Sequence, residues 1–445
     1  MLREESVYMV RRSSLDPNVV RDQLTNAPRN NELFNLTINV ITPMFGGGYE
    51  AGEVDSERPI NAKEIRGHLR FWWRACKGGG FRSAEEMFEK EAEIWGSTDK
   101  PSAVDVVVEV TNAGRSVACA RFTRGQDGLY RATPTFEQNW PPYALFPFQG
   151  KLTQSKQQIE VNPSNALTGV EFRLILSRSA SSTLSEEELR EEVGDALWAW
   201  ITFGGIGART RRGCGALWCS NGYPFEQLDP NRLVEIAGSH IDGNGIAQIP
   251  KLSGASLVVG NNPANPLTAW CRAVEVIKDF RQDRNQGQQH NRPGRSRWPE
   301  PDSIRRISGR ACGKHQPNPD APNYFPRADL GLPIVFHFKD RGDPGDHILG
   351  IGDRAKGRMA SPVIAKPLAI SETQALPMIL LLNAPHAWES MYNVILCGQV
   401  ERPLIENDIN DPAKNAKVAP LRGQSAREAL LDFAARRLNG EVVEL

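Results

Sequence analysis

Residues 170–219 have the sequence VEFRLILSRSASSTLSEEELREEVGDALWAWITFGGIGARTRRGCGALWC, and three patterns in this stretch decide the fold. Alternating apolar residues at 170, 172, 174 and 176 predict a half-buried strand. Ser185, with Glu188 three residues later, is a capping box, and apolar residues at 189, 193, 197 and 200 continue with helical spacing. A glycine-rich loop at 204–215 and a short strand at 216–219 follow. The stretch therefore predicts a strand, a helix, a loop and a second strand.

The preceding residues supply the other elements of the same unit. Residues 33–41 alternate as a strand, which Thr42-Pro43 ends before a glycine turn at 46–48. Helical patterns follow at 62–77 and from Ser83 to Gly96. Strands are predicted at 103–110 and 116–122, with a hairpin turn at 112–115 between them. A long polar segment follows at 130–168. The first half is thus predicted to have the order βαββαβ, as in ferredoxin-like domains, with insertions.

The second half predicts a further α+β unit. After an interdomain passage at 221–265, the patterns indicate a helix at 266–281, an irregular polar segment at 282–327, strands at 332–338 and 391–399, and a helix near 424–438. We therefore expect an α+β fold with one domain in residues 1–225 and a second in residues 226–445.

Composition excludes several classes of protein. The chain has 445 residues, with 53 lysines and arginines balanced by 53 acidic residues, so net charge does not point to nucleic acid. It has no run of about 18 apolar residues, and its N-terminus lacks the apolar stretch of a signal peptide. The seven cysteines are scattered, which favours reduced thiols. A cytoplasmic protein is expected.

The helix at 62–77 has two faces. Apolar residues at 65, 69, 72 and 76 form a core stripe, and a second stripe is basic: Lys63, Arg66, Arg70, Arg74 and Lys77. This basic stripe suits either phosphate contact or a solvated face with long side chains. Gly67, in mid-helix, costs about 1 kcal/mol relative to alanine, and it would serve either close packing or close approach of a ligand.

The loop at 204–215 is the second basic feature. Five of its twelve residues are glycine, and Arg209, Arg211 and Arg212 have no acidic residue between them. Backbone N–H groups and guanidinium groups together suit phosphate oxygens. The loop lacks the Gly-Lys-Ser/Thr of a P-loop and the third glycine of a dinucleotide fingerprint, so a polyanion is the better ligand. A tight turn with exposed arginines is the alternative.

Basic residues gather again in the second half. One cluster contains Arg295, Arg297, Arg305, Arg306, Arg310, Lys314 and His315. Trp298 lies within it and is a candidate for stacking on a base. A glycine-basic loop at 350–358 provides Arg354, Lys356 and Arg358. Local clusters in a neutral chain fit a surface that binds RNA on one face, and surface loops are the alternative.

These motifs resemble the RAMP superfamily of CRISPR systems and, within it, subunits of type III-B (Cmr) effector complexes. The landmarks that carry the resemblance lie in order at residues 42–48, 58–59, 65–75, 94–97, 204–215, 296–299, 330–338 and 358–362. Two mild departures are Arg66, where the family pattern usually has lysine, and Trp95, where it usually has phenylalanine.

The resemblance implies two tandem ferredoxin-like (RRM-like) domains in a non-catalytic subunit. Such a subunit lies at the head of a filamentous complex, near the 3′ end of the guide RNA, and its partners are guide RNA (crRNA), target RNA and the other RAMP and small subunits. It also implies RNA contact by the glycine-rich loop, namely Gly204, Gly205, Gly207, Arg209, Thr210, Arg211, Arg212, Gly213 and Gly215, and by the basic helix through Lys63, Arg66, Arg70 and Arg74. No cofactor is implied.

Three alternatives stay open. A metal-independent guide-processing endoribonuclease would use His68 as its acid or base, and a metal-assisted nuclease would use a loop aspartate such as Asp127. The bland interpretations are a packed histidine and an Asp-Gly turn. A protein-only scaffold would use the tryptophans at its interfaces. Zinc is not expected, because neither Cys214-x4-Cys219 nor Cys312-x2-His315 has an obvious partner pair.

Overall fold

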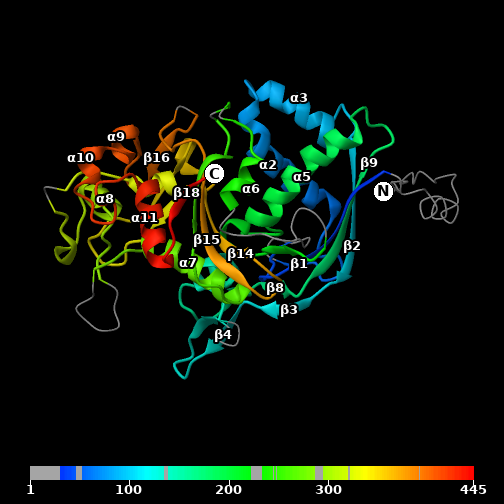
Figure 1. The fold of residues 1–445 in the computed structure, drawn as a ribbon. Coiled ribbons are helices and arrows are strands. Elements are labelled where there is room, and N and C mark those ends of the chain that lie inside the picture. The colour runs from blue at the N-terminus through cyan, green and yellow to red at the C-terminus, as the bar shows by residue number, and fades with distance from the viewer. Residues whose placement is uncertain are drawn as a thin grey trace, which may run out of the picture.

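The computed structural model describes residues 31–46, 53–134, 139–221, 233–243, 245–246, 248–285, 294–318, 321–389 and 391–445 (Figure 1). The fold is α+β, with several small antiparallel sheets. In this part of the chain, none of the helices combines the length and the apolar composition needed to span a bilayer. The predicted glycine turn at 46–48 and the domain boundary at 225 fall partly or wholly outside the described residues.

The first sheet has the strand order β10-β1-β9-β2, with all neighbours antiparallel. Its strands are β1 (Glu32–Val40), β2 (Val104–Asn112), β9 (Glu171–Arg178) and β10 (Leu217–Cys219). Helices α2 (Ala62–Lys77) and α3 (Ala84–Trp95) lie between β1 and β2, and α5 (Glu186–Phe203) lies between β9 and β10. The predicted order βαββαβ is therefore present in the first half, with α3 as an addition.

The second sheet repeats this connectivity. Its order is β14-β15-β11-β18, again antiparallel, with strands β11 (Lys251–Val259), β14 (Val363–Ala369), β15 (Ala375–Asn383) and β18 (Val442–Glu444). Helix α7 (Pro266–Arg281) follows β11, and α11 (Ala426–Leu438) precedes β18. Counted along the chain, both sheets have the strand order 4-1-3-2, with a helix after the first strand and after the third.

The two units share one core. Helices α2 and α5 cover the first sheet, and their outer sides pack on the second sheet, so Ile65 and Leu197 lie in the same buried cluster as Leu257 and Leu380. Helices α7 and α11 cover the opposite face of the second sheet. Strands β14 and β15 are thus buried on both faces, and apart from Asn383 each of their residues is buried.

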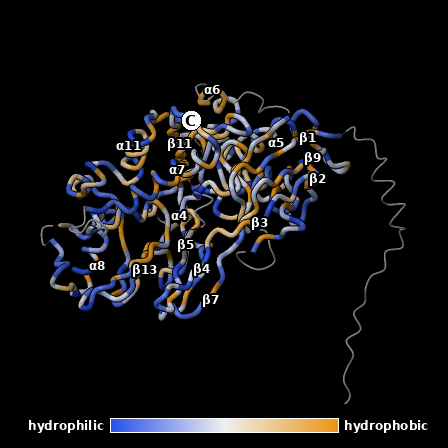
Figure 2. Tube along the Cα trace, turned by 90° about the horizontal axis from the view of Figure 1, so that it is seen from below, coloured by the Kyte–Doolittle hydropathy of each residue, from blue (hydrophilic) through white to orange (hydrophobic). Residues whose placement is uncertain are grey.

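Further segments extend from these sheets. Between β2 and β9 lie three two-stranded ribbons and a short helix: β3 (Arg115–Ala118) with β8 (Asn165–Thr168), β4 (Ala120–Arg124) with β5 (Tyr130–Pro134), β6 (Lys151–Leu152) with β7 (Ile159–Val161), and α4 (Pro142–Leu145). Figure 2 shows that this projecting arm, between β4 and β7, is largely hydrophilic.

A third antiparallel sheet arises from two insertions in the second unit, one between α7 and β14 and one between β15 and α11. Its order is β12-β13-β16-β17. The strands are β12 (Ile334–Phe336), β13 (His347–Ile351), β16 (Val394–Cys397) and β17 (Arg402–Pro403), and α8 (Glu300–Ser308), α9 (Glu406–Ile409) and α10 (Pro412–Asn415) belong to the same insertions. Ile304, Phe325, Leu349 and Leu396 form a separate core there. Figure 1 shows this unit at the end of the molecule far from β2.

Several sequence predictions need correction. The hairpin predicted around 112–115 is wrong, because β2 pairs with β9 and β3 pairs with β8. The passage predicted at 221–265 contains α6 (Leu233–Gly238) and β11, an inner strand of the second sheet. The irregular segment at 282–327 contains α8. Strands β13, β14 and β15 were not predicted at all.

Candidate nucleic-acid interface

The glycine-rich loop is fixed to the first sheet by its own backbone. Helix α5 ends where Gly204 N–H donates to Trp200 O, and the Trp200 Nε1–H donates to Gly205 O at 2.9 Å. The amides of Ile206, Ala208 and Gly215 donate to Gly215 O (2.9 Å), Phe45 O (2.7 Å) and Pro43 O (3.0 Å). The N–H groups of these three residues are therefore used internally. RNA contact by the other predicted residues of the loop stays a prediction: Gly204, Gly205, Gly207, Thr210 and Gly213.

The glycines of the loop serve close packing. A Cβ on Gly213 would lie 2.5 Å from Trp270 Cδ1, and one on Gly215 would lie 1.9 Å from Ile206 O. Both residues also have positive φ (75° and 65°), which side chains disfavour. The loop consequently rests against Trp270 of α7, whose Nε1–H donates to Arg212 O at 2.6 Å.

The arginines of the loop have neutral partners. Arg209 donates to Tyr143 O at 3.5 Å, Arg211 donates to Ser361 O and lies 5.6 Å from the Phe71 ring centroid, and Arg212 donates to Val363 O at 2.9 Å. Arg281, at the end of α7, donates to Leu330 O at 3.1 Å and interacts electrostatically with Arg212. These four residues are called the arginine cluster below.

The arginine cluster is an uncompensated positive site. Among the described residues, none of the three loop arginines forms an ion pair with a carboxylate, and Glu300, the acid that acts on Arg281, binds Arg327 at 3.0 Å. The Nε of Arg209 is buried without a hydrogen-bond partner. Burial, with the neighbouring arginines, lowers the pKa of Arg212 to about 10. Because like charges are gathered without counter-charge, an anion bound here would stabilise the site.

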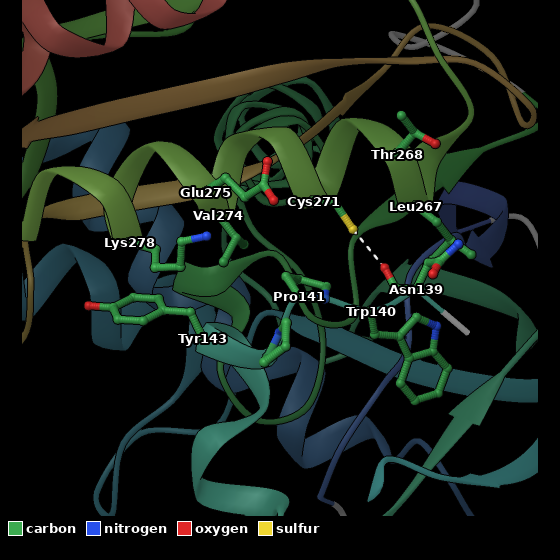
Figure 3. Close-up of a pocket in the computed structure, with 11 residues that line it drawn as sticks. Asn139, Trp140, Pro141, Tyr143, Leu267, Thr268, Cys271, Val274, Glu275 and Lys278 are labelled. Atoms are coloured by element: carbon green, nitrogen blue, oxygen red, sulfur yellow. Dashed lines mark hydrogen bonds between the residues drawn. The ribbon is translucent and has the colours of Figure 1, made fainter. Parts of the chain in front are cut away.

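A cavity of about 420 Å³ lies beside the arginine cluster, between α7 and the segment that leads into α4 (Figure 3). Tyr143, whose carbonyl accepts from Arg209, is part of its wall. Trp140 and Leu267 add apolar surface, while Glu275 and Lys278 of α7 supply polar groups. Its size and mixed lining are those of a small-ligand site, and a nucleobase beside a bound phosphate would match both.

The basic stripe of α2 has internal partners. Arg70 Nε and Arg74 Nη1 lie 2.6 and 2.5 Å from Glu91 Oε1 of α3, and Arg66 donates to Val104 O at 3.3 Å. Lys77 is buried, 2.6 Å from Asp195. Lys63 is exposed. These contacts favour a packing role for the stripe, which attaches α3 to α2, and RNA contact by Lys63, Arg66, Arg70 and Arg74 stays a prediction.

Most basic residues of the second half also have partners. Arg295 and Arg297 pair with Asp302 (2.5 Å) and Asp283 (3.2 Å), Arg305 pairs with Asp343 (2.8 Å), and Arg306 donates to Asn323 Oδ1 (2.9 Å). Arg354, Lys356 and Arg358 are exposed on the loop after β13. RNA contact by these seven residues stays a prediction.

Trp298 does not lie on the surface. It is 2% exposed and donates to Phe280 O at 2.8 Å, and Arg327 lies over its ring at 5.4 Å. The prediction that it stacks on a base is therefore wrong.

The two candidate nuclease residues occupy structural positions. His68 stacks on Trp200, with ring centroids 6.1 Å apart, and its Nε2 lies 3.9 Å from Glu64 Oε1, which accepts from Gly207 N. Asp127 lies at the tip of the β4–β5 hairpin and pairs with Arg131 at 2.5 Å. Both arrangements match the bland interpretations, a packed histidine and a turn aspartate.

Sequence reasoning missed two features. Arg281 is the last residue of an amphipathic helix that also contains Arg272, so only the docking of the two units reveals its place in the arginine cluster. Cys312 and His315 were set aside for want of partner ligands, yet Asp340 and Asp343 lie beside them, with all four donor atoms within 4.8 Å of one another. The spacing Asp340-x2-Asp343 was the available signal.

Comparisons with known proteins agree on one family. The RAMP superfamily model matches residues 37–218. The CRISPR system Cmr subunit Cmr1-2 of Pyrococcus furiosus is 27% identical over 186 residues, which are 40% of this chain and 91% of that protein. Cmr subunit Cmr1-1 of the same organism is 24% identical over 159 residues, 36% of this chain and 40% of that protein.

Solved structures are similar at lower identity. The apo crystal structure of Cmr1 from Pyrococcus furiosus has 17% identity and a TM-score of 0.46, covering 92% of this chain and 97% of that one. A chain in the cryo-EM structure of the type III-B Cmr-beta complex bound to cognate target RNA has 12% identity and a TM-score of 0.46, covering 91% and 100%.

Proposed function

We propose that the chain is an RNA-binding, non-catalytic subunit of a type III-B (Cmr) RNA-guided effector complex, because residues 37–218 match the RAMP superfamily model and its relatives are Cmr subunits. The observation that carries the proposal is the arginine cluster, in which the three loop arginines are partly buried and have no carboxylate partner among the described residues. Its relatives are named as Cmr subunits, and one similar chain belongs to a complex bound to target RNA.

The arginine cluster is suited to positioning the RNA backbone. Carbonyl oxygens of Ser361 and Val363 hold the guanidinium groups of Arg211 and Arg212 without neutralising them, so their charge stays available to phosphates. Phosphate contacts fix orientation but carry no base sequence, which suits a subunit that must accept any guide. The neighbouring cavity would receive a base by stacking and shape.

The remaining features of the proposal concern assembly. Each of the two βαββαβ units is proposed to be a ferredoxin-like domain, with the boundary near residue 225. The chain would lie at the head of the filament, near the 3′ end of the guide RNA, with guide and target RNA and the other RAMP and small subunits as partners. The exposed loop with Arg354, Lys356 and Arg358 is a candidate for a second contact with RNA or a neighbouring subunit.

One incubation tests the main claim. Purified protein, alone and in complex with its co-expressed partner subunits, is mixed with end-labelled single-stranded RNA in Mg²⁺ or in EDTA, then analysed on native and denaturing gels. A salt-sensitive shift with intact RNA supports the proposal. Discrete products that disappear in His68→Ala or Asp127→Ala would replace it with the nuclease alternative. If the chain assembles into the complex but does not cross-link to RNA when the mixture is irradiated, the protein-only scaffold would be favoured.

A further inference from the structure

Two turns of the third-sheet unit face each other. One is the turn from Cys312 to His315, closed by His315 N–H donating to Cys312 O at 2.9 Å. The other lies in the β12–β13 connection and runs from Asp340 to Asp343, closed by Asp343 N–H donating to Asp340 O at 3.1 Å. Gly342, with φ of 98°, supplies the left-handed backbone conformation that the second turn adopts beside Cys312. Each turn thus presents two side chains separated by two residues.

The four side chains converge on one point. His315 Nδ1 lies 3.2 Å from Cys312 Sγ, 3.2 Å from Asp340 Oδ2 and 3.2 Å from Asp343 Oδ2. All four donor atoms lie within 4.8 Å of one another. A single N–H group cannot donate to three acceptors at once, so hydrogen bonding alone does not account for the arrangement. A cation among the four atoms would.

The spacing and the donor types match zinc. Zinc-ligand bonds of about 2.0–2.3 Å in a tetrahedron place the donor atoms about 3.3–3.8 Å apart. The three distances from His315 Nδ1, each 3.2 Å, are close to this range. Structural zinc sites commonly draw their ligands as pairs separated by a few residues, which both turns provide. The thiol and imidazole disfavour Ca²⁺ and Mg²⁺, which prefer oxygen ligands alone.

Charge and outer contacts also fit a dication. Two carboxylates and a thiolate carry three negative charges, and Arg305, which donates to both oxygens of Asp343 at 3.0 and 2.8 Å, compensates one of them. The two charges that are left equal those of Zn²⁺. Arg305 and the Cys312 N–H, which donates to Asp343 Oδ1 at 3.0 Å, orient the Asp343 carboxylate toward the other ligands.

We propose that Cys312, His315, Asp340 and Asp343 bind one Zn²⁺ ion in a structural site. Four protein ligands leave no open position for water, which distinguishes a structural from a catalytic zinc. The ion would tie the segment after α8 to the β12–β13 connection and so fix the small third-sheet unit. The sequence-based expectation of no metal is thereby replaced, because the missing partner pair is Asp340 and Asp343. The proposal is independent of RNA binding.

Cobalt substitution of the full chain tests the site. Chelator-treated protein is titrated with Co²⁺, and a thiolate-to-Co²⁺ charge-transfer band should grow to one equivalent and vanish on addition of Zn²⁺. Cys312→Ser should lose the band, and Asp340→Asn, altered at an exposed position, should bind at least tenfold more weakly. Cys397→Ser and Asp353→Asn, a cysteine and an aspartate of the same unit outside the cluster, should behave as the unaltered chain.

Folding is monitored separately by circular dichroism. Elemental analysis of protein purified without chelator should give one zinc per chain, and chelator should lower the melting temperature of the unaltered chain but not that of Cys312→Ser. A folded unaltered chain with neither zinc nor a cobalt band would overturn the proposal. A band that persists in Cys312→Ser would overturn it too, because the thiolate would then come from another cysteine.

Discussion

Replacing Arg209, Arg211 and Arg212 together by alanine should weaken binding of single-stranded RNA about a hundredfold at about 0.1 M salt. Each phosphate contact on a single strand contributes about 0.7 to the slope of log affinity against log salt concentration, so three contacts contribute about 2. Relative to about 1 M salt, this slope corresponds to about two decades of affinity at about 0.1 M salt. The structure justifies counting all three residues, because none of them has a carboxylate partner among the described residues that would already have neutralised it.

Fluorescence anisotropy of labelled RNA across a salt series measures both affinity and slope. The matched control is Arg131→Ala with Arg436→Ala and Arg437→Ala, which removes the same charge from three exposed arginines paired with Asp127, Asp432 and Asp279. The control should leave the slope within about 0.5 of the unaltered chain, and a triple lysine variant of the loop should retain most of it. An unchanged slope in a folded triple-alanine variant would refute the assignment of the loop.

Three further predictions concern stability. Gly67→Ala should raise the free energy of unfolding by about 1 kcal/mol, because a Cβ there meets nothing within 4 Å. Gly194→Ala in α5 should raise it by less, because its Cβ would lie 3.4 Å from Phe34. Urea unfolding of both variants measures the two free energies. Glu91→Gln should destabilise the fold by about 2 kcal/mol, because it breaks both ion pairs that attach α3 to α2, and an unchanged melting temperature would contradict this. Burial lowers the pKa of Lys366 to about 7, so between that value and the unfolded value near 10.5 only the unfolded chain binds the proton. The free energy of unfolding should therefore rise with pH in this range by up to about 1.4 kcal/mol per pH unit. The rise should be absent in Lys366→Met, and equal pH profiles of the two proteins would contradict the prediction.

Local patterns predicted the elements whose signals are local. The helix at 62–77 is N-capped by Asn61, whose side chain accepts from Glu64 N, and has a buried stripe at the expected positions. Ser185 and Glu188 form the predicted capping box of α5. The alternation at 170–176 became β9 because this strand has one face on the core of α2 and α5. In each of these elements, sequence spacing and burial follow the same period.

Two of the missed strands, β14 and β15, lie in a sheet that is covered on both faces. Strand β14 has the sequence VIAKPLA and β15 has ALPMILLLN, and neither alternates, because helices cover both sides of the sheet. Each strand also contains a proline, and Pro367 pairs with Pro377 at the end of β15 that β11 does not reach. Apolar runs with proline do not distinguish a buried strand from a loop.

The candidate site lay partly beyond prediction, because it is assembled from two units. The sequence identified Arg209, Arg211 and Arg212, but the carbonyl groups that hold Arg211 and Arg212 come from Ser361 and Val363, about 150 residues later. Which carbonyl groups face Arg211 and Arg212 depends on how the second sheet docks on α2 and α5. The loop amides, in contrast, donate to acceptors of the first unit, such as Phe45 O and Pro43 O, a feature that glycine content alone does not reveal.

Lys366 shows how closely the arginine cluster depends on that shared core. Its Nζ, buried in β14, donates to Thr202 O at 2.8 Å and Ile201 O at 3.4 Å, at the last turn of α5. The glycine-rich loop begins at Gly204, directly after this turn, and β14 also supplies Val363 O to Arg212. One strand of the second unit therefore holds the end of the helix that leads into the loop and also holds an arginine within it. The loop geometry is thus fixed by contacts between the units, and a substitution that loosens their docking would displace the arginine cluster without altering any arginine.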